Sequence, residues 1–175
     1  MIEVQNLTKV YGSKTAVENV SFKIRNGRIY GLLGPNGAGK STTMNIMTGC
    51  LSPTEGTVLI NGYDICDQPI EAKRQIGYLP EQPPLYLDMT VEEYLIFNYN
   101  LKGCKLNRNK HLEEICEVVK IKDVYKRVIR NLSKGYKQRV GIAQAMLGFP
   151  EVIILDEPTS FLDVRHKLEL LAILR

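Results

Sequence analysis

The hydrophobic and polar positions divide the chain into a β-rich first part and a more helical second part. Residues 1–28 alternate β-rich runs, at 2–4 and 17–24, with turn signals at Tyr11-Gly12 and Asn26-Gly27. This pattern is typical of antiparallel strands. The apolar run 29–33 then leads into a glycine-rich loop at 34–39 and a helix-compatible stretch, 40–48, that closes at Gly49. We therefore expect a strand, a loop and a helix in this order.

The following stretch returns to β character before it becomes helical. Residues 57–60 and 76–79 read as strands, with an Asn61-Gly62 turn after the first of them,. Thr90 and Glu93 have the spacing of a capping box and precede the helical residues 94–101,. Further helical character is expected at 107–120 and after Ser133, a second N-cap candidate.

The last part of the chain predicts one more strand and one more helix. The apolar run 152–155 lies between polar residues and predicts a short, fully buried parallel strand,. Residues 163–174 predict a helix with an apolar side,. Taken together, the elements predict an α/β domain with an antiparallel β-subdomain at its N-terminus and a helical subdomain at about 83–150.

The composition is that of a folded domain. The chain has 175 residues, of which 44% are hydrophobic and 24% charged, and this suffices to bury a core. No apolar run approaches the roughly 20 residues that span a bilayer, and the first residues lack the pattern of a signal peptide. We therefore expect a soluble, cytoplasmic protein whose four cysteines remain thiols without an assigned role,.

The net charge of +4 is concentrated in one segment. Residues 102–139 carry 12 Lys and Arg against 4 Asp and Glu, which leaves −4 for the rest of the chain. Such a segment can meet nucleic acid, anionic lipid or phosphate. A solvated helix face is the more common explanation and the one favoured here.

The strongest chemical signal is the sequence GPNGAGKS at 34–41. It satisfies the P-loop pattern and lies between an apolar run and a helix start, where its mechanism requires it. Glycines let backbone N–H groups surround phosphates at a helix N-terminus. The sequence thus predicts a site for ATP and Mg²⁺ in which Lys40 reaches the β- and γ-phosphates and Ser41 holds the metal. The expected ATP-binding residues are Tyr11, Gly34, Pro35, Asn36, Gly37, Ala38, Gly39, Lys40, Ser41 and Thr42.

Two carboxylates directly follow the apolar run 152–155. Ligands of open α/β sheets gather at the carboxyl ends of the strands. We expect Asp156 to bind Mg²⁺ through its water shell and Glu157 to polarise the attacking water as a general base. The alternative, two polar residues that merely end a strand, loses weight because the P-loop is present.

The sequence LSKGYKQRVGIAQAML at 132–147 resembles the signature of the ABC ATPase family, which is commonly LSGGQ. It is similar to the variant found in ATPases of exporters and permeases. Ser133 caps a helix, and Gly135 allows close approach to a phosphate. The resemblance implies that Ser133, Lys134, Gly135 and Tyr136 contact ATP held by an opposite subunit, in a homodimer or heterodimer with shared sites.

The resemblance extends over the whole chain and assigns further positions. Tyr11 falls where the family stacks an aromatic ring on adenine, and Asp163 falls in the D-loop, although Phe161 is larger than the usual residue there. The Q-loop departs from the family pattern, since Glu81 stands where Gln is usual and Gln82 is adjacent. Glu81 is favoured for this role, and Gln82 remains open.

The resemblance also implies a C-terminally incomplete domain. The family's switch histidine lies well beyond the catalytic glutamate, and the sequence ends 18 residues after Glu157. His166 sits too close to the D-loop to replace it. In the family, the strand that leads to the histidine inserts between the P-loop strand and the strand at 152–155. We therefore expect unpaired strand edges and a marginal fold.

The function implied is that of the ATP-binding and ATP-hydrolysing subunit of an ABC transporter. It would bind a transmembrane permease and lie on the inner face of the cell membrane, with no nucleic acid as a partner. One alternative is a soluble ABC ATPase that acts on the ribosome or DNA through the basic segment 102–139. A second is a nucleotide-binding fragment without hydrolysis.

Overall fold

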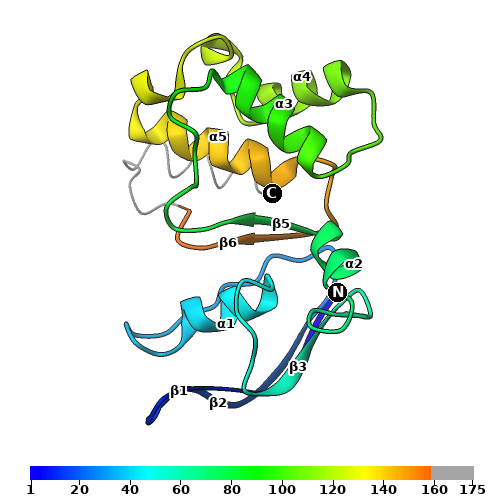
Figure 1. Ribbon diagram of the computed structural model, residues 1–175, viewed down its shortest axis with the longest axis vertical. Helices are drawn as coiled ribbons and strands as arrows, with labels where there is room; N and C mark the ends of the chain where they lie inside the picture. The colour runs from blue at the N-terminus through cyan, green and yellow to red at the C-terminus, as the bar shows by residue number, and fades with distance from the viewer. Residues whose placement is uncertain (159–175) are drawn as a thin grey trace. The chain divides into compact units, whose positions relative to one another are not determined.

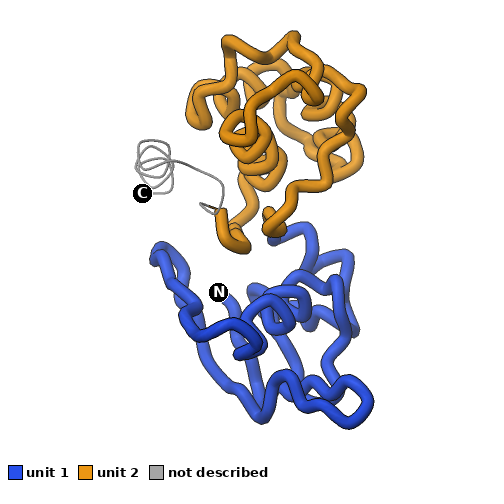
Figure 2. The backbone as a smooth tube through the Cα atoms, turned by 90° about the vertical axis from the view of Figure 1, so that its left-hand side faces the viewer, with its two compact units in different colours: residues 1–76 blue, residues 77–175 orange. Residues whose placement is uncertain are grey.

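The computed structural model describes residues 1–158, and these form parts of two compact units, Met1–Ile76 and Gly77–Arg175 (Figure 2). Each unit is described by itself below. No helix in the described part of the chain is long and apolar enough to cross a membrane. The four cysteines, all within this part, are free thiols, as the sequence predicted.

The first unit contains an antiparallel sheet of four strands, in the order β2-β1-β3-β4 (Figure 1). The strands are β1 (Ile2–Tyr11), β2 (Lys14–Ile24), β3 (Glu55–Ile60) and β4 (Tyr63–Asp64). The predicted antiparallel entry is confirmed, and Asn61-Gly62 forms the turn between β3 and β4. Buried apolar side chains from β1 and β3 form the core of the sheet: Ile2, Val4, Leu7, Val58 and Ile60.

Two helices accompany this sheet. Helix α1 (Lys40–Met47) lies against β2 and β3 and ends before Gly49, as predicted. Helix α2 (Pro69–Arg74) lies against β4 and was missed by the sequence analysis. The available signal was Pro69 at the first helical position with Lys73 and Arg74 in the last turn, a combination that favours a short helix.

The prediction of a strand at 29–33 is wrong for the described structure. Residues 28–35 have no regular secondary structure, and Ile29 and Leu33 are 73% and 92% exposed. A strand forms where a neighbouring strand takes up its backbone hydrogen bonds. The two sheets of the described residues comprise only β1–β4 and β5–β6, so this run has no ladder to join.

The second unit is built on a pair of strands, β5 (Ile76–Leu79, which begins at the unit boundary) and β6 (Val152–Leu155). Their arrows point in the same direction in Figure 1, so the pair is parallel. The predicted strand at 152–155 is confirmed, but the expectation of full burial is wrong. Ile154 is 6% exposed and Ile153 41%; because successive side chains of a strand point to opposite faces, the two faces of β6 differ in burial.

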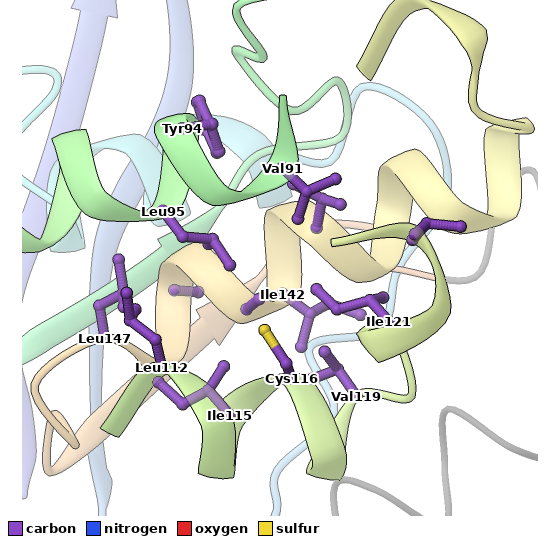
Figure 3. Packing of buried hydrophobic residues seen from close by; sticks show 14 of the residues in the cluster. Val91, Tyr94, Leu95, Leu112, Ile115, Cys116, Val119, Ile121, Ile142 and Leu147 are labelled. Atoms are coloured by element: carbon purple, nitrogen blue, oxygen red, sulfur yellow. The ribbon is translucent and has the colours of Figure 1, made fainter. Parts of the chain in front are cut away.

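Between these two strands the chain forms three helices and two short 3₁₀ turns. They are α3 (Val91–Leu101), α4 (Arg108–Val118), η1 (Lys122–Val124), η2 (Ile129–Asn131) and α5 (Lys134–Met146). The helices enclose an apolar core that includes Leu95, Ile115 and Ile142 (Figure 3). The predicted capping box is present, since Thr90 and Glu93 exchange side-chain and backbone hydrogen bonds at the start of α3.

Two glycines let α5 approach β5 and the loop that follows it. A Cβ on Gly141 would meet Leu79 Cδ1 at 2.6 Å and Pro83 at 3.0 Å, and a Cβ on Gly77 would meet the carbonyl oxygen of Ala145 at 2.0 Å. Any larger residue would push the helix away from the strand. This close packing positions the signature helix on the strand that leads to the Q-loop candidates.

Most basic side chains of the segment 102–139 lie on the surface of the helices. Lys122, for example, pairs with Glu113 at 3.4 Å and Glu117 at 3.3 Å. Their distribution agrees with a solvated helix face.

Candidate nucleotide site

The glycine-rich loop is held in a conformation that only glycine adopts easily. Gly37 and Gly39 have φ angles of +82° and +84°, and residues other than glycine rarely adopt this region. A Cβ on Gly39 would also meet the carbonyl oxygen of Ala16 at 2.4 Å and Val17 Cγ2 at 2.9 Å. Gly39, the N-cap of α1, therefore packs directly against β2 and fixes the position of the loop.

The loop delivers the N-terminus of α1 to the surface. The first backbone bond of the helix runs from the N–H of Thr43 to the carbonyl of Gly39, at 2.8 Å. The N–H groups of Lys40, Ser41 and Thr42 precede this bond, and they lie at the positive end of the helix dipole. The first turn contains no acidic residue, and its N-cap Gly39 has no side-chain cap. The arrangement suits a phosphate group.

Lys40 folds back over the same loop. Its Nζ donates to the carbonyl oxygens of Gly34, at 2.7 Å, and Pro35, at 2.9 Å. Three N–H donors on a flexible stem let the ammonium group exchange these carbonyls for phosphate oxygens. The side chain thus lies beside the helix N-terminus, at the place where the sequence put the phosphates.

Tyr11 ends β1 at the hairpin that also supports the loop. Its ring is 47% exposed, and the Lys9 Nζ lies 5.3 Å from the ring centroid. Tyr11 pairs with Lys14 across the hairpin, and Ala16, which approaches Gly39, belongs to the same strand as Lys14. An exposed ring on this hairpin suits a stacking role, which remains a prediction.

The two carboxylates follow β6 in the second unit, as predicted. The backbone N–H of Asp156 donates to the carbonyl of Leu79 at 2.9 Å and extends the pairing with β5 beyond the strand. Glu157 has a φ of +45°, a left-handed conformation that is unfavourable for this residue type,. Such local strain concentrates at functional sites. Five other non-glycine residues of the described chain share a positive φ, so the backbone conformation agrees with a functional role of Glu157 but does not single it out.

The Q-loop candidates lie at the same edge of this sheet. β5 and β6 are parallel (Figure 1), so their carboxyl ends meet at one edge. Glu81 and Gln82 follow β5 there, and both side chains are exposed. The structure brings this loop next to Asp156, and it favours neither candidate over the other.

The signature segment begins α5 as expected. Ser133 is the N-cap, and its Oγ accepts a hydrogen bond from the N–H of Tyr136 at 3.3 Å. Lys134 and Gly135 form the first turn, on an end of the helix that is exposed or half-exposed. Asp163, Phe161 and His166 lie outside the described residues.

One polar partner in this segment was missed by the sequence analysis. Asp123, in η1, accepts a hydrogen bond from the hydroxyl of Tyr136 at 2.5 Å. The two residues are 13 positions apart in different elements, and no periodicity or motif links them. Only the packing of η1 against α5 makes them neighbours.

The residues present fit a hard cation, although no group of three or more His, Cys, Asp or Glu side chains gathers in the described part of the chain. Mg²⁺ prefers oxygen ligands and keeps several waters, so it needs few protein ligands. Ser41 offers a hydroxyl in the first turn of α1, where a phosphate would bind. Asp156 offers a carboxylate at the end of β6. Ser41 belongs to the first unit and Asp156 to the second.

Comparison with protein families decides the class of this site. A family model described as ABC transporter matches residues 17–160. This chain belongs to the ABC transporter family. The matched segment contains the glycine-rich loop, the signature segment and the carboxylates, so the fold predicted from the resemblance is confirmed.

Relatives in this ABC transporter family include proteins of antibiotic transport. The chain is 39% identical to the bacitracin transport ATP-binding protein BcrA of Bacillus licheniformis, over 93% of this chain and 53% of the relative. It is 37% identical to the lantibiotic transport ATP-binding protein SrtF of Streptococcus pyogenes, over 93% of this chain and 69% of the relative. The chain spans about half the length of several curated relatives that it matches, such as BcrA with 53%.

Solved structures of ABC cassettes are similar as well. One is the dimeric, post-hydrolysis state of the cassette MJ0796 bound to ADP and Pi, with a TM-score of 0.88 and 30% identity. The similarity covers 99% of this chain and 81% of that one. The chain therefore has the fold of a nucleotide-binding ABC cassette.

Proposed function

We propose that this chain is the ATP-binding and ATP-hydrolysing subunit of an ABC transporter. The observation that carries the proposal is the exposed N-terminus of α1. Its N-cap, Gly39, packs against β2, and no side chain caps the helix there. This end of a helix is an anion site by its backbone alone. The family match supports ATP as the anion.

Each residue has a separate role in the proposed reaction. Backbone N–H groups of the loop 34–39 and of the first turn of α1 hold the phosphates, and Lys40 neutralises charge that develops on them. Bound Mg²⁺ would supply charge neutralisation between the phosphates, with Ser41 and Asp156 as its holders. Glu157 orients a water for attack and accepts its proton.

The proposed assembly is a dimer of ATPase subunits on a membrane permease. The helix N-terminus at Ser133 has the same anion-binding character as that of α1, and it serves the ATP held by the opposite subunit. The dimeric state of the similar cassette MJ0796 supports this arrangement. The names of BcrA and SrtF support a transport role, and a subunit that serves a permease in this way would lie at the inner face of the cell membrane.

The test is nucleotide binding by Lys40→Ala. Loss of the ammonium removes a charged phosphate contact from an exposed loop and leaves the core intact, so affinity for MgATP should fall by at least about tenfold. Titration with a fluorescent ATP analogue measures the change. Arg74→Ala is the matched control, because Arg74 is an exposed cation of the same unit in the last turn of α2. Equal affinities for Lys40→Ala and the unmodified chain would exclude this P-loop as the site.

A further inference from the structure

We infer that Tyr136 is a positioning residue that fixes the N-terminus of the signature helix on η1. The inference rests on the proposed function, because it concerns how α5 presents its first turn to ATP on a second subunit. Tyr136 lies in this first turn, and its hydroxyl donates to Asp123 Oδ2 at 2.5 Å. Its backbone N–H donates to Ser133 Oγ at 3.3 Å. One residue thus connects the helix cap with a separate element.

A second contact of the Tyr136 ring involves Arg139. The guanidinium of Arg139, one turn later, lies 5.9 Å from the centroid of the Tyr136 ring. Arg139 Nη1 donates to the carbonyl of Lys120 at 3.5 Å, and Lys120 lies between α4 and η1. The Tyr136 side chain thus contacts a carboxylate through its hydroxyl and a cation near its ring, and both partners connect it to the segment at 120–123.

The charge of Asp123 strengthens the link. A hydrogen bond to an ionised acceptor is roughly twice as strong as one between neutral groups. The pKa of the Tyr136 hydroxyl is raised, first by its hydrogen bond to Asp123 and then by burial, so the hydroxyl keeps its proton and remains the donor.

The pair matters because an anion site at a helix N-terminus depends on several N–H groups that point the same way. The first turn of a helix frays easily, since its N–H groups have no intrahelical acceptors. The Ser133 side chain caps one of these N–H groups, that of Tyr136, at a donor–acceptor distance of 3.3 Å. A side-chain anchor in the same turn keeps Ser133 and Gly135 aligned for a phosphate. The tyrosine stands where LSGGQ has glutamine, a shorter side chain.

The experiment compares Tyr136→Phe and Asp123→Ala, separately and combined, with the unmodified chain. Hydrogen–deuterium exchange of the amides at 134–137 reports the order of the first turn. Each single variant should raise this exchange about tenfold, as expected for one lost charged hydrogen bond. The double variant should add little, since both changes break the same bond. Asp123→Asn, which keeps an oxygen acceptor without the charge, should give a smaller rise.

Enzyme kinetics provide the functional readout. The variants should lower kcat for ATP hydrolysis about tenfold with little change in KM. The P-loop, which binds ATP before the dimer closes, lies in the first unit of the chain and is unchanged in these variants. Tyr125→Phe is the matched control. It removes a tyrosine hydroxyl only two residues from Asp123, and this hydroxyl makes no hydrogen bond with other described residues. It should leave exchange and kcat unchanged.

The outcomes separate this inference from the proposed function. Exchange at 134–137 equal to that of the unmodified chain, or an equal effect of Tyr125→Phe, overturns the role of Tyr136. An unchanged kcat in an active protein overturns it as well. If the unmodified chain binds no ATP, the proposed function fails, and hydrogen exchange alone then decides whether Tyr136 orders the helix start.

Discussion

At the scale of single residues, His111 is the buried titratable group with the clearest consequence. Its side chain on α4 is only 3% exposed, and its Nε2 accepts a hydrogen bond from the N–H of Gly148 at 2.9 Å. The ring packs edge-on against Phe149, with centroids 4.5 Å apart. Protonation would remove the acceptor from Nε2. The neutral ring therefore ties α4 to the end of α5.

We predict that this contact makes stability depend on pH. Burial lowers the pKa of His111, Lys102 lowers it further, and Glu114 partly opposes them. The unfolded chain then binds a proton more readily than the folded one, so the free energy of unfolding decreases as pH falls below the unfolded pKa of about 6.5. Above that pH, the contribution is fully present. Urea unfolding at several pH values between 5 and 8 measures the effect.

The control for His111 is His111→Gln, which does not titrate. Carboxylates also titrate toward pH 5, so the informative quantity is the difference between the two proteins. The unmodified chain should lose more stability than His111→Gln between pH 7 and pH 5. Parallel pH profiles would show that His111 contributes nothing to the pH dependence.

At the scale of elements, the capping box at the start of α3 is the best test of local stability. The N–H of Glu93 donates to Thr90 Oγ1 at 3.2 Å, and the N–H of Thr90 donates to Glu93 Oε2 at 2.8 Å. The N–H of Val91 also donates to the carbonyl of Arg127 at 3.0 Å. The helix start is thus fixed by its own side chains and by a distant segment.

We predict that Thr90→Ala destabilises the second unit by about 1 kcal/mol, the usual cost of a lost N-cap. Thr90→Ser keeps the hydroxyl and should lose much less. The same Ala variant should raise the pKa of Glu93 only part of the way toward its ordinary value, because it keeps the backbone N–H of residue 90, which lowers this pKa most, and removes the hydroxyl bond, which lowers it less. Chemical denaturation measures the first effect and carboxyl NMR titration the second. Similar stabilities of the Ala and Ser variants would contradict the role of the cap.

At the scale of the whole molecule, the proposed cycle couples hydrolysis to dimerisation. We predict that Glu157→Gln keeps ATP binding, loses ATP turnover and accumulates an ATP-bound dimer. The amide preserves the shape of the side chain but cannot accept a proton from water. Sedimentation velocity with MgATP measures the dimer, and phosphate release measures turnover.

Glu151→Gln serves as the control for this prediction, because Glu151 precedes β6 at the strand end opposite to Glu157. It should hydrolyse ATP and dissociate like the unmodified chain. Turnover in Glu157→Gln at the rate of the unmodified chain would remove Glu157 from the role of general base.

The sequence by itself determined the parts of this protein that depend on short-range bonds. The loop at 34–39, the start of α1 and the caps at Thr90 and Ser133 lie where the sequence predicted them. Each of them is made by residues within a few positions of one another. Glycine conformations and cap hydrogen bonds are properties of the local chain, so motif and spacing suffice to predict them.

Only the tertiary structure decided which apolar runs became strands and which side chains met. The runs 29–33 and 152–155 look alike in sequence, yet only the second is a strand, because β5 lies beside it. Tyr136 gained its partner Asp123 in the same way, through the packing of η1 against α5. Strand pairing and side-chain neighbours depend on segments distant in sequence, and such contacts form only when the whole unit folds.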